Sequence, residues 1–141
     1  MGVDMEFYVQ RRKVNGITYE TLPIHKKDGT PVCIWRRGRE KWDWVRDQAA
    51  GTITWLERRM LAIDTKWYVP SEDEEPEIPT YDFSLSHLKN LAAADYEDDE
   101  GGEDKKRFWT DLLNEVEVML NLADEFWYHP DNVRIVCFVS Y

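Results

Sequence analysis

Residues 104–140 read DKKRFWTDLLNEVEVMLNLADEFWYHPDNVRIVCFVS, and they contain the two clearest secondary-structure patterns of the 141-residue chain. Apolar side chains recur three and four residues apart through its first part, which predicts one long amphipathic helix over about 104–128. The apolar stripe consists of Phe108, Trp109, Leu112, Leu113, Val116, Met119, Leu120, Ala123, Phe126 and Trp127. Residues 129–132, which include proline, aspartate and asparagine, then predict a turn that ends the helix.

Residues 133–140 predict a strand that closes the fold. Apolar residues at 133, 135, 137 and 139 follow the two-residue period of a strand. Val136 and Phe138 occupy the alternate positions and are apolar as well. Because both faces of the strand then carry apolar side chains, we expect it to be covered on both sides and to lie inside a sheet.

The N-terminal part of the chain contains three strand-like segments separated by two turn signals. Residues 5–10, 17–22 and 30–35 are rich in aromatic and β-branched side chains. Asn15-Gly16 and Asp28-Gly29 lie between these segments, and both dipeptides are typical of tight hairpin turns. The sequence therefore predicts an antiparallel, β-rich N-terminal half with hairpins at these turns, arranged as a three-stranded meander.

Residues 39–69 admit both helix and strand interpretations. Trp42, Val45 and Ala49 share one helical face, whereas Trp42 and Trp44 alternate as in a strand. Further along, the apolar spacing favours a helix over about 52–62 and a strand over about 64–69.

A shorter helix is predicted directly after Ser84, because serine is a preferred helix N-cap. The residues on its apolar face are Leu85, Leu88, Leu91 and Ala92. These patterns together predict an α+β fold: a β-rich first half, C-terminal helices and a closing strand. A chain of this length buries roughly 70% of the surface that it exposes when unfolded, so we expect a single domain over residues 1–141.

The sequence contains no signature of export or of membrane insertion. Cys33 and Cys137 are far apart in strand-like segments and resemble small buried hydrophobes rather than a disulfide framework. The N-terminus lacks the apolar core of a signal peptide, and no apolar run approaches the roughly 18 residues of a membrane span. We therefore expect a cytoplasmic protein that does not contact membranes.

Charge is divided unequally along the chain. Residues 1–69 contain 13 Lys and Arg against 9 Asp and Glu, whereas residues 70–141 contain 5 against 19. Much of the excess lies in two runs, 71–77 and 95–104, that contain no basic residue. Proline or glycine interrupts each run, so we expect acidic loops at about 70–80 and 95–104, the second of them mobile. Such a concentration of negative charge repels nucleic acid and attracts basic surfaces.

The acidic runs have a structural and a functional interpretation. They keep a protein soluble as solvated loops, or their carboxylates take the place of phosphate groups in the basic groove of a nucleic-acid-binding partner. The residues that would form this acidic surface are Glu72, Asp73, Glu74, Glu75, Glu97, Asp98, Asp99 and Glu100. An EF-hand calcium loop is not predicted, because neither Gly101 nor Gly102 at the loop's glycine position puts oxygen ligands at the other required positions.

Basic and aromatic residues are interleaved in residues 35–44, a pattern that suits phosphate contact and base stacking. The residues of this alternative interface are Trp35, Arg36, Arg37, Arg39, Lys41, Trp42 and Trp44. We favour a core position for the tryptophans, since their rings are mostly buried in proteins, while the arginines neutralise the chain's own acids. A protein interface is a third interpretation, because Trp and Arg are common anchors there.

No catalytic motif competes with these surfaces. The sequence contains no phosphate-binding glycine loop, no metalloprotease helix motif and no serine elbow. His25, His87 and His129 have no metal-ligand spacing among them. We therefore assign no catalytic residue, no metal ligand and no cofactor, and we expect a protein that is not an enzyme.

The resulting functional hypothesis is an acidic binding protein, a nucleic-acid mimic that inhibits or masks a basic, nucleic-acid-handling partner such as a nuclease. A phage anti-defence protein or an immunity protein would fit this description, and direct nucleic-acid binding is not expected. Two alternatives stay open: a phage structural or assembly protein with an aromatic interface, and a small nucleic-acid-binding module that uses residues 35–44. The oligomeric state also stays open.

Overall fold

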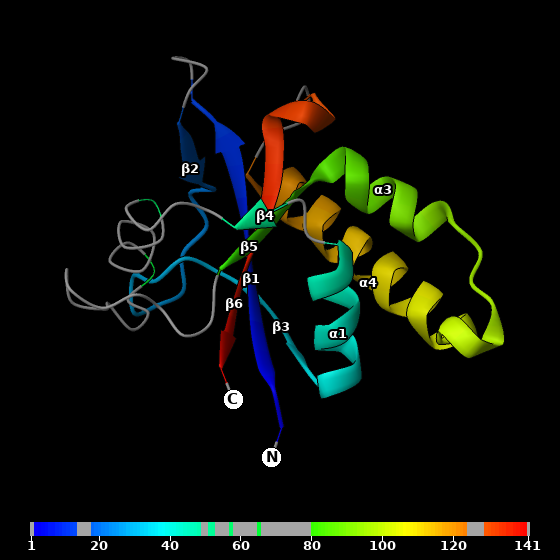
Figure 1. The fold of residues 1–141 in the computed structure, drawn as a ribbon. Coiled ribbons are helices and arrows are strands. Elements are labelled where there is room, and N and C mark those ends of the chain that lie inside the picture. The colour runs from blue at the N-terminus through cyan, green and yellow to red at the C-terminus, as the bar shows by residue number, and fades with distance from the viewer. Residues whose placement is uncertain are drawn as a thin grey trace.

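The computed structural model describes residues 2–13, 18–48, 51–52, 57, 65, 80–123 and 129–140. They form an α+β fold in which the helices pack against one face of an antiparallel sheet (Figure 1). The strands are β1 (Asp4–Arg12), β2 (Tyr19–Thr21), β3 (Ile34–Arg37), β4 (Gly51–Thr52), β5 (Tyr81–Ser84) and β6 (Val133–Ser140). The helices are α1 (Arg39–Gln48), α3 (Leu85–Ala93) and α4 (Gly102–Leu122), with the short 3-10 helices η1 (Asp98–Glu100) and η2 (Pro130–Asn132). The predicted fold class is confirmed.

The C-terminal strand β6 lies inside the sheet, as its pattern predicts. Its neighbours are β1, which pairs with it from Asp4↔Ser140 to Arg11↔Val133, and β5 on the other edge. The strand order is β2-β1-β6-β5-β4. One face of β6 contributes Ile135 to the main core under the helices, and the other face packs Val136 with Tyr8 and Phe138. Apolar residues at successive positions of β6 therefore have partners on both sides of the sheet.

The two predicted hairpin turns differ in what surrounds them. Strand β2 pairs antiparallel with β1, as a hairpin at Asn15-Gly16 requires, and residues 14–17 themselves lie outside the described residues. At the second turn, Gly29 has a φ of 87°, and the Asp28 carboxylate accepts a hydrogen bond from the Thr30 N–H at 2.9 Å. The backbone pairs across this turn through a bridge between His25 and Pro31.

The predicted three-stranded meander is wrong in its pairing. Strand β3 does not pair with β2; it pairs with β1 at Asp4–Phe7, while β2 pairs with β1 at Gln10–Arg12. The far edge of β1 is occupied by β6, so β2 and β3 lie end to end along one edge. The third strand therefore begins at Ile34, because the residues just before it belong to the small hairpin that separates β2 from β3.

The ambiguous region 39–69 begins as a helix. In α1 the residues Trp42 and Val45 are buried, which is the helical interpretation of that pattern. Of residues 53–79 the structure describes Glu57 and Thr65, both helical. Glu57 agrees with the helix predicted over about 52–62, whereas the strand predicted over about 64–69 is wrong at Thr65. Thr52, where the predicted helix begins, belongs to strand β4 instead, and the rest of both predicted elements lies outside the described residues.

The two C-terminal helices agree with their predictions. Ser84 caps α3, since its hydroxyl accepts a hydrogen bond from the His87 N–H at 3.1 Å. Helix α4 begins at Gly102 and ends at Leu122 with its C-cap at Ala123, about six residues before the predicted end, and residues 124–128 lie outside the described part of the chain. Its buried stripe comprises Phe108, Trp109, Leu112, Val116, Met119 and Leu120.

The main core joins the two halves of the chain. Trp109 of α4 is fully buried and meets Phe83 of β5 edge-on, with ring centroids 6.1 Å apart. Side chains of β1, such as Phe7, belong to the same core. The single domain over residues 1–141 stays a prediction. Within the described segments, no helix combines the length and the apolar composition that a bilayer span requires.

Candidate functional site

An exposed acidic turn connects α3 to α4. Its carboxylates, here called the acidic edge, are Asp95, Glu97, Asp98, Asp99, Glu103 and Asp104, all of them exposed. The turn is tight because the Gly101 N–H donates to the Asp98 carbonyl at 3.4 Å and the Gly102 N–H donates to the Glu97 carbonyl at 3.0 Å. Both glycines have positive φ values, 109° and 53°, which residues with a Cβ rarely adopt.

Several contacts hold the acidic edge against the body of the protein. The Tyr96 hydroxyl donates to the Leu91 carbonyl at 2.7 Å, and the Lys105 ammonium lies 4.9 Å from the centre of the Tyr96 ring. A Cβ atom at Gly101 would lie only 3.0 Å from Cζ2 of Trp44 in α1. The run is therefore a packed turn, with a 3-10 helix in its middle, and it becomes part of α4 at Gly102.

The charge of this edge is partly balanced from within. The Lys106 ammonium donates to the Ala94 carbonyl at 2.8 Å and lies 3.1 Å from the Asp95 carboxylate. Glu103 and Asp104 occupy the first turn of α4, where the helix dipole favours negative charge. Exposed ion pairs of this kind contribute about 0–1 kcal/mol, so most of the carboxylates remain hydrated and accessible.

The described structure contains part of the acidic surface predicted from the sequence. Glu97, Asp98 and Asp99 lie together and exposed in the α3–α4 connection, and that they bind a partner stays a prediction. Residues 72–75 and the side chain of Glu100 lie outside what the structure describes. Asp95, Glu103 and Asp104 also belong to the acidic edge, although we did not assign them to the predicted acidic surface. Their position in the same acidic run, 95–104, could have indicated this. The predicted loop over 95–104 is wrong at Asp98–Glu100, which form η1, and from Gly102 onward, where α4 begins; the mobility of the run stays a prediction.

The basic and aromatic segment 35–44 is divided among different environments. Trp42 and Trp44 are 3% and 9% exposed and belong to the main core, whereas Trp35 is 53% exposed. Successive strand residues face opposite sides of a sheet, so Arg36 points away from Trp35. Nη2 of Arg36 donates to the Glu115 carboxylate of α4 at 2.7 Å. The structure therefore does not bring these seven residues onto one surface.

A shallow groove of about 450 Å³ lies between α1 and α4. The residues that line it include Arg36, Arg39, Lys41 and Arg107, together with Asp104 and Asp111. Trp44 and Phe108 line it as well, with ring centroids 5.7 Å apart. Basic side chains of α1 and β3 thus face acidic side chains of α4, which agrees with the interpretation that the arginines neutralise the chain's own acids.

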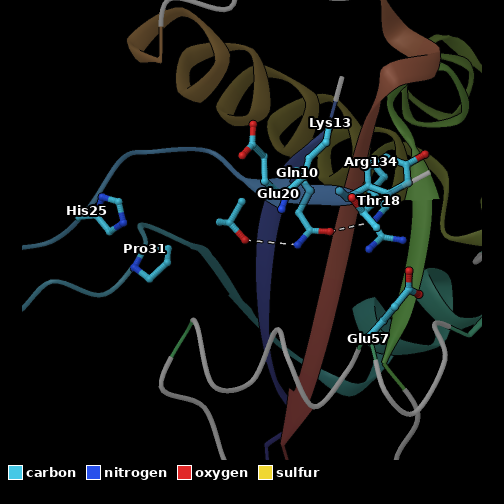
Figure 2. A pocket seen from close by; sticks show the side chains of 10 residues that line it. Gln10, Lys13, Thr18, Glu20, His25, Pro31, Glu57 and Arg134 are labelled. Carbon is cyan, nitrogen blue, oxygen red and sulfur yellow. Dashed lines mark hydrogen bonds between the residues drawn. The ribbon is translucent and has the colours of Figure 1, made fainter. Parts of the chain in front are cut away.

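A second hollow, a polar pocket of about 400 Å³, opens beside β1, β2 and β6 (Figure 2). Its centre is a chain of hydrogen bonds. Nε of Arg134 donates to Oε1 of Gln10 at 2.8 Å, and Nε2 of Gln10 donates to the Thr21 hydroxyl at 3.3 Å. The Tyr19 ring covers the Arg134 guanidinium, with its centroid 4.1 Å from Cζ. This polar pocket was not predicted from the sequence. Arg134 could have indicated it, because a charged residue is unexpected in a strand that is covered on both faces.

Burial raises the pKa of one carboxyl group beside Arg134 and of both thiols. Burial raises the pKa of Asp82; the Arg134 guanidinium, with Nη1 3.9 Å from Oδ2 of Asp82, acts in the opposite direction, and the Glu57 carboxylate raises it further. Burial also raises the pKa of the Cys33 and Cys137 thiols. Since the thiolate is the reactive form, neither cysteine has the environment of an activated nucleophile.

Comparison with known proteins adds no relative. The chain matches no protein-family model, no curated protein and no solved structure. Within the described part of the chain, no group of three or more His, Cys, Asp or Glu residues is arranged to hold a metal ion. The function must therefore be argued from the acidic edge and the polar pocket.

Proposed function

We propose that the protein is a non-enzymatic binding protein whose acidic edge docks on a basic partner and inhibits or masks it. The observation that carries this proposal is the acidic edge itself, where six exposed carboxylates lie close together in sequence along the packed α3–α4 connection and the first turn of α4. A formal net charge of −10 adds a long-range field of the same sign. That field speeds encounter with a basic surface and disfavours nucleic acid as a direct ligand.

Attachment of the turn to the protein body supports this function physically. A disordered acidic loop would lose conformational freedom on binding, and that loss would offset part of the electrostatic attraction. Here the Tyr96 and Lys106 contacts already restrict the turn before any partner arrives. Carboxylates presented in this way can occupy lysine and arginine sites that otherwise hold phosphates.

The partner that we propose is a basic protein that handles nucleic acid, for example a nuclease. A protein that blocks such an enzyme would work in the cytoplasm, as a phage anti-defence factor or an immunity protein does. The binding would be weakened by salt, since the Debye length falls from about 10 Å at 0.1 M to about 3 Å at 1 M ionic strength.

The test is capture of the partner with matched variants. The edge variant carries Glu97→Gln, Asp98→Asn and Asp99→Asn; the control variant carries Asp43→Asn, Asp47→Asn and Glu117→Gln, which changes the net charge equally elsewhere. Immobilised wild type and control should retain a basic protein that added DNA or RNA displaces, and the edge variant should retain severalfold less. Equal retention by all three proteins would rule out the acidic edge as the docking surface.

One observation favours a second candidate function. Trp35 is 53% exposed, and α4 exposes Val118 and Leu122 four residues apart. An aromatic or apolar interface of a structural or assembly protein would use such residues. In that case the protein would form an oligomer or a complex whose affinity is independent of salt, and Trp35→Ala would weaken it while the edge variant would not.

A further inference from the structure

We propose that the polar pocket is a binding site for a small oxyanion, a carboxylate or phosphate group, held between Arg134 and Lys13. This proposal is independent of the acidic edge, which lies at the α3–α4 connection. It rests on the placement of buried polar groups, on the atoms that they leave available, and on the charge at one end of the pocket.

The polar groups occupy positions where the fold alone would favour apolar ones. Val136 and Phe138 lie on the same face of β6 as Arg134, and they are buried against Tyr8 of β1. Gln10 continues that face of β1 and is 4% exposed, and the Arg134 side chain is 12% exposed. Replacing a buried ionic group by apolar residues of similar volume is often neutral or stabilising, so stability gives little reason to keep an arginine here.

The guanidinium is fixed in orientation but retains donors. Its Nε donates to Gln10, and the Tyr19 ring covers one face. Nη1 lies 3.9 Å from the Asp82 carboxylate, which is beyond hydrogen-bond distance. Neither terminal nitrogen donates a hydrogen bond to the described residues, and the side chain as a whole is 12% exposed. Two terminal nitrogens in a fixed plane match the two oxygens of a carboxylate or phosphate.

Two basic side chains lie at one end of the pocket. Figure 2 shows Lys13 and Arg134 near Gln10, with His25 and Pro31 at the opposite end. Two carboxylates line the pocket as well: Glu20 lies 2.7 Å from Nε of Arg11, so its charge is balanced within the sheet, whereas Glu57 lies near Arg134 and opposes an anion there. A volume of about 400 Å³ leaves room for a small organic anion whose body extends toward His25.

The experiment is a titration of the full-length protein with sodium phosphate and, separately, sodium acetate, followed by ¹H–¹⁵N NMR at constant ionic strength. We expect saturable shifts of the Gln10 side-chain amide and the Arg134 Nε–H, with dissociation constants on the order of 1 mM. Lys13→Gln should weaken binding severalfold, and Lys27→Gln, which removes an equal charge at the tip of the second hairpin, should leave it unchanged. Arg134→Lys should abolish it, because lysine lacks the fork of two nitrogens.

The two salts separate the possible ligands. Shifts with phosphate alone assign a phosphate-bearing ligand, and shifts with both assign a general oxyanion site. The proposal is overturned if the pocket resonances do not saturate with either salt, or if Lys13→Gln and Lys27→Gln reduce binding equally. If Arg134→Lys does not fold, the comparison of Lys13→Gln with Lys27→Gln tests the proposed oxyanion site by itself.

Discussion

Replacing Arg134 by methionine should destabilise the protein by about 2–4 kcal/mol, although it removes a buried charge. The substitution removes the Arg134 Nε–H that donates to Oε1 of the Gln10 side-chain amide. Because Gln10 is only 4% exposed, leaving this oxygen without a hydrogen bond costs about 1–3 kcal/mol. Loss of the guanidinium above the Tyr19 ring adds about 0.5–1 kcal/mol. The lost pairing with Asp82 adds less than about 1 kcal/mol, because that carboxylate is partly exposed and solvent screens it.

Adding Gln10→Leu to Arg134→Met should restore most of the lost stability. With Gln10→Leu and Arg134→Met together, no buried Gln10 amide is left without its donor, so the double variant should recover that cost of about 1–3 kcal/mol and lie within about 2 kcal/mol of the wild type, the remainder being the lost Tyr19 and Asp82 contacts. Each single variant should be less stable than the double, a coupling of about 2 kcal/mol that urea denaturation followed by tryptophan fluorescence can measure. Free energies of unfolding that simply add in the double variant would refute the argument that Gln10 and Arg134 form one buried unit.

Three further predictions concern the pocket and the core. Burial raises the folded-state pKa of Asp82 above its ordinary value, so stability is lost as pH rises from that ordinary value through the folded-state pKa, and the loss is constant above it. Asp82→Asn should therefore be more stable than wild type near pH 7 but equal to it below pH 3, as measured by thermal unfolding at both pH values. Leu112→Ala, at a fully buried position of α4, should cost about 2–5 kcal/mol in chemical denaturation, whereas Leu122→Ala at the exposed end should change stability by less than about 0.5 kcal/mol. Ser84→Ala should cost about 1 kcal/mol through loss of the α3 cap, and Ser84→Asp, which keeps an acceptor, should retain most of the stability.

The elements with a strong local signal were predictable from the sequence. The apolar stripe of α4, the Ser84 cap and the two-sided apolar pattern of β6 each depend on the physics of a single helix or strand, and each prediction is confirmed. The pairing of β3 was not predictable in this way. A local pattern indicates a strand but not its partner, and here the small hairpin around Gly29 displaces β3 along β1.

Of the two candidate sites, the one formed by neighbouring residues was predictable and the one formed by distant residues was not. The acidic edge could be predicted because its residues are consecutive, and the structure adds that two glycines turn them onto the start of α4. The polar pocket could not, because Gln10 and Arg134 are 124 residues apart and meet only when β1 pairs with β6. The burial of Trp42 beside an exposed Trp35 likewise depends on which side of the sheet the helices cover.

The central claim, that the acidic edge binds a basic partner, is tested most directly by the salt dependence of that binding. The partner captured from lysate should bind the wild type with an affinity that falls steeply between about 0.05 and 0.5 M salt, because charge complementarity drives the encounter. The edge variant should bind more weakly at low salt and with a flatter slope, whereas the variant with Asp43, Asp47 and Glu117 neutralised should follow the wild type. An edge variant with unchanged affinity and unchanged slope would contradict the account.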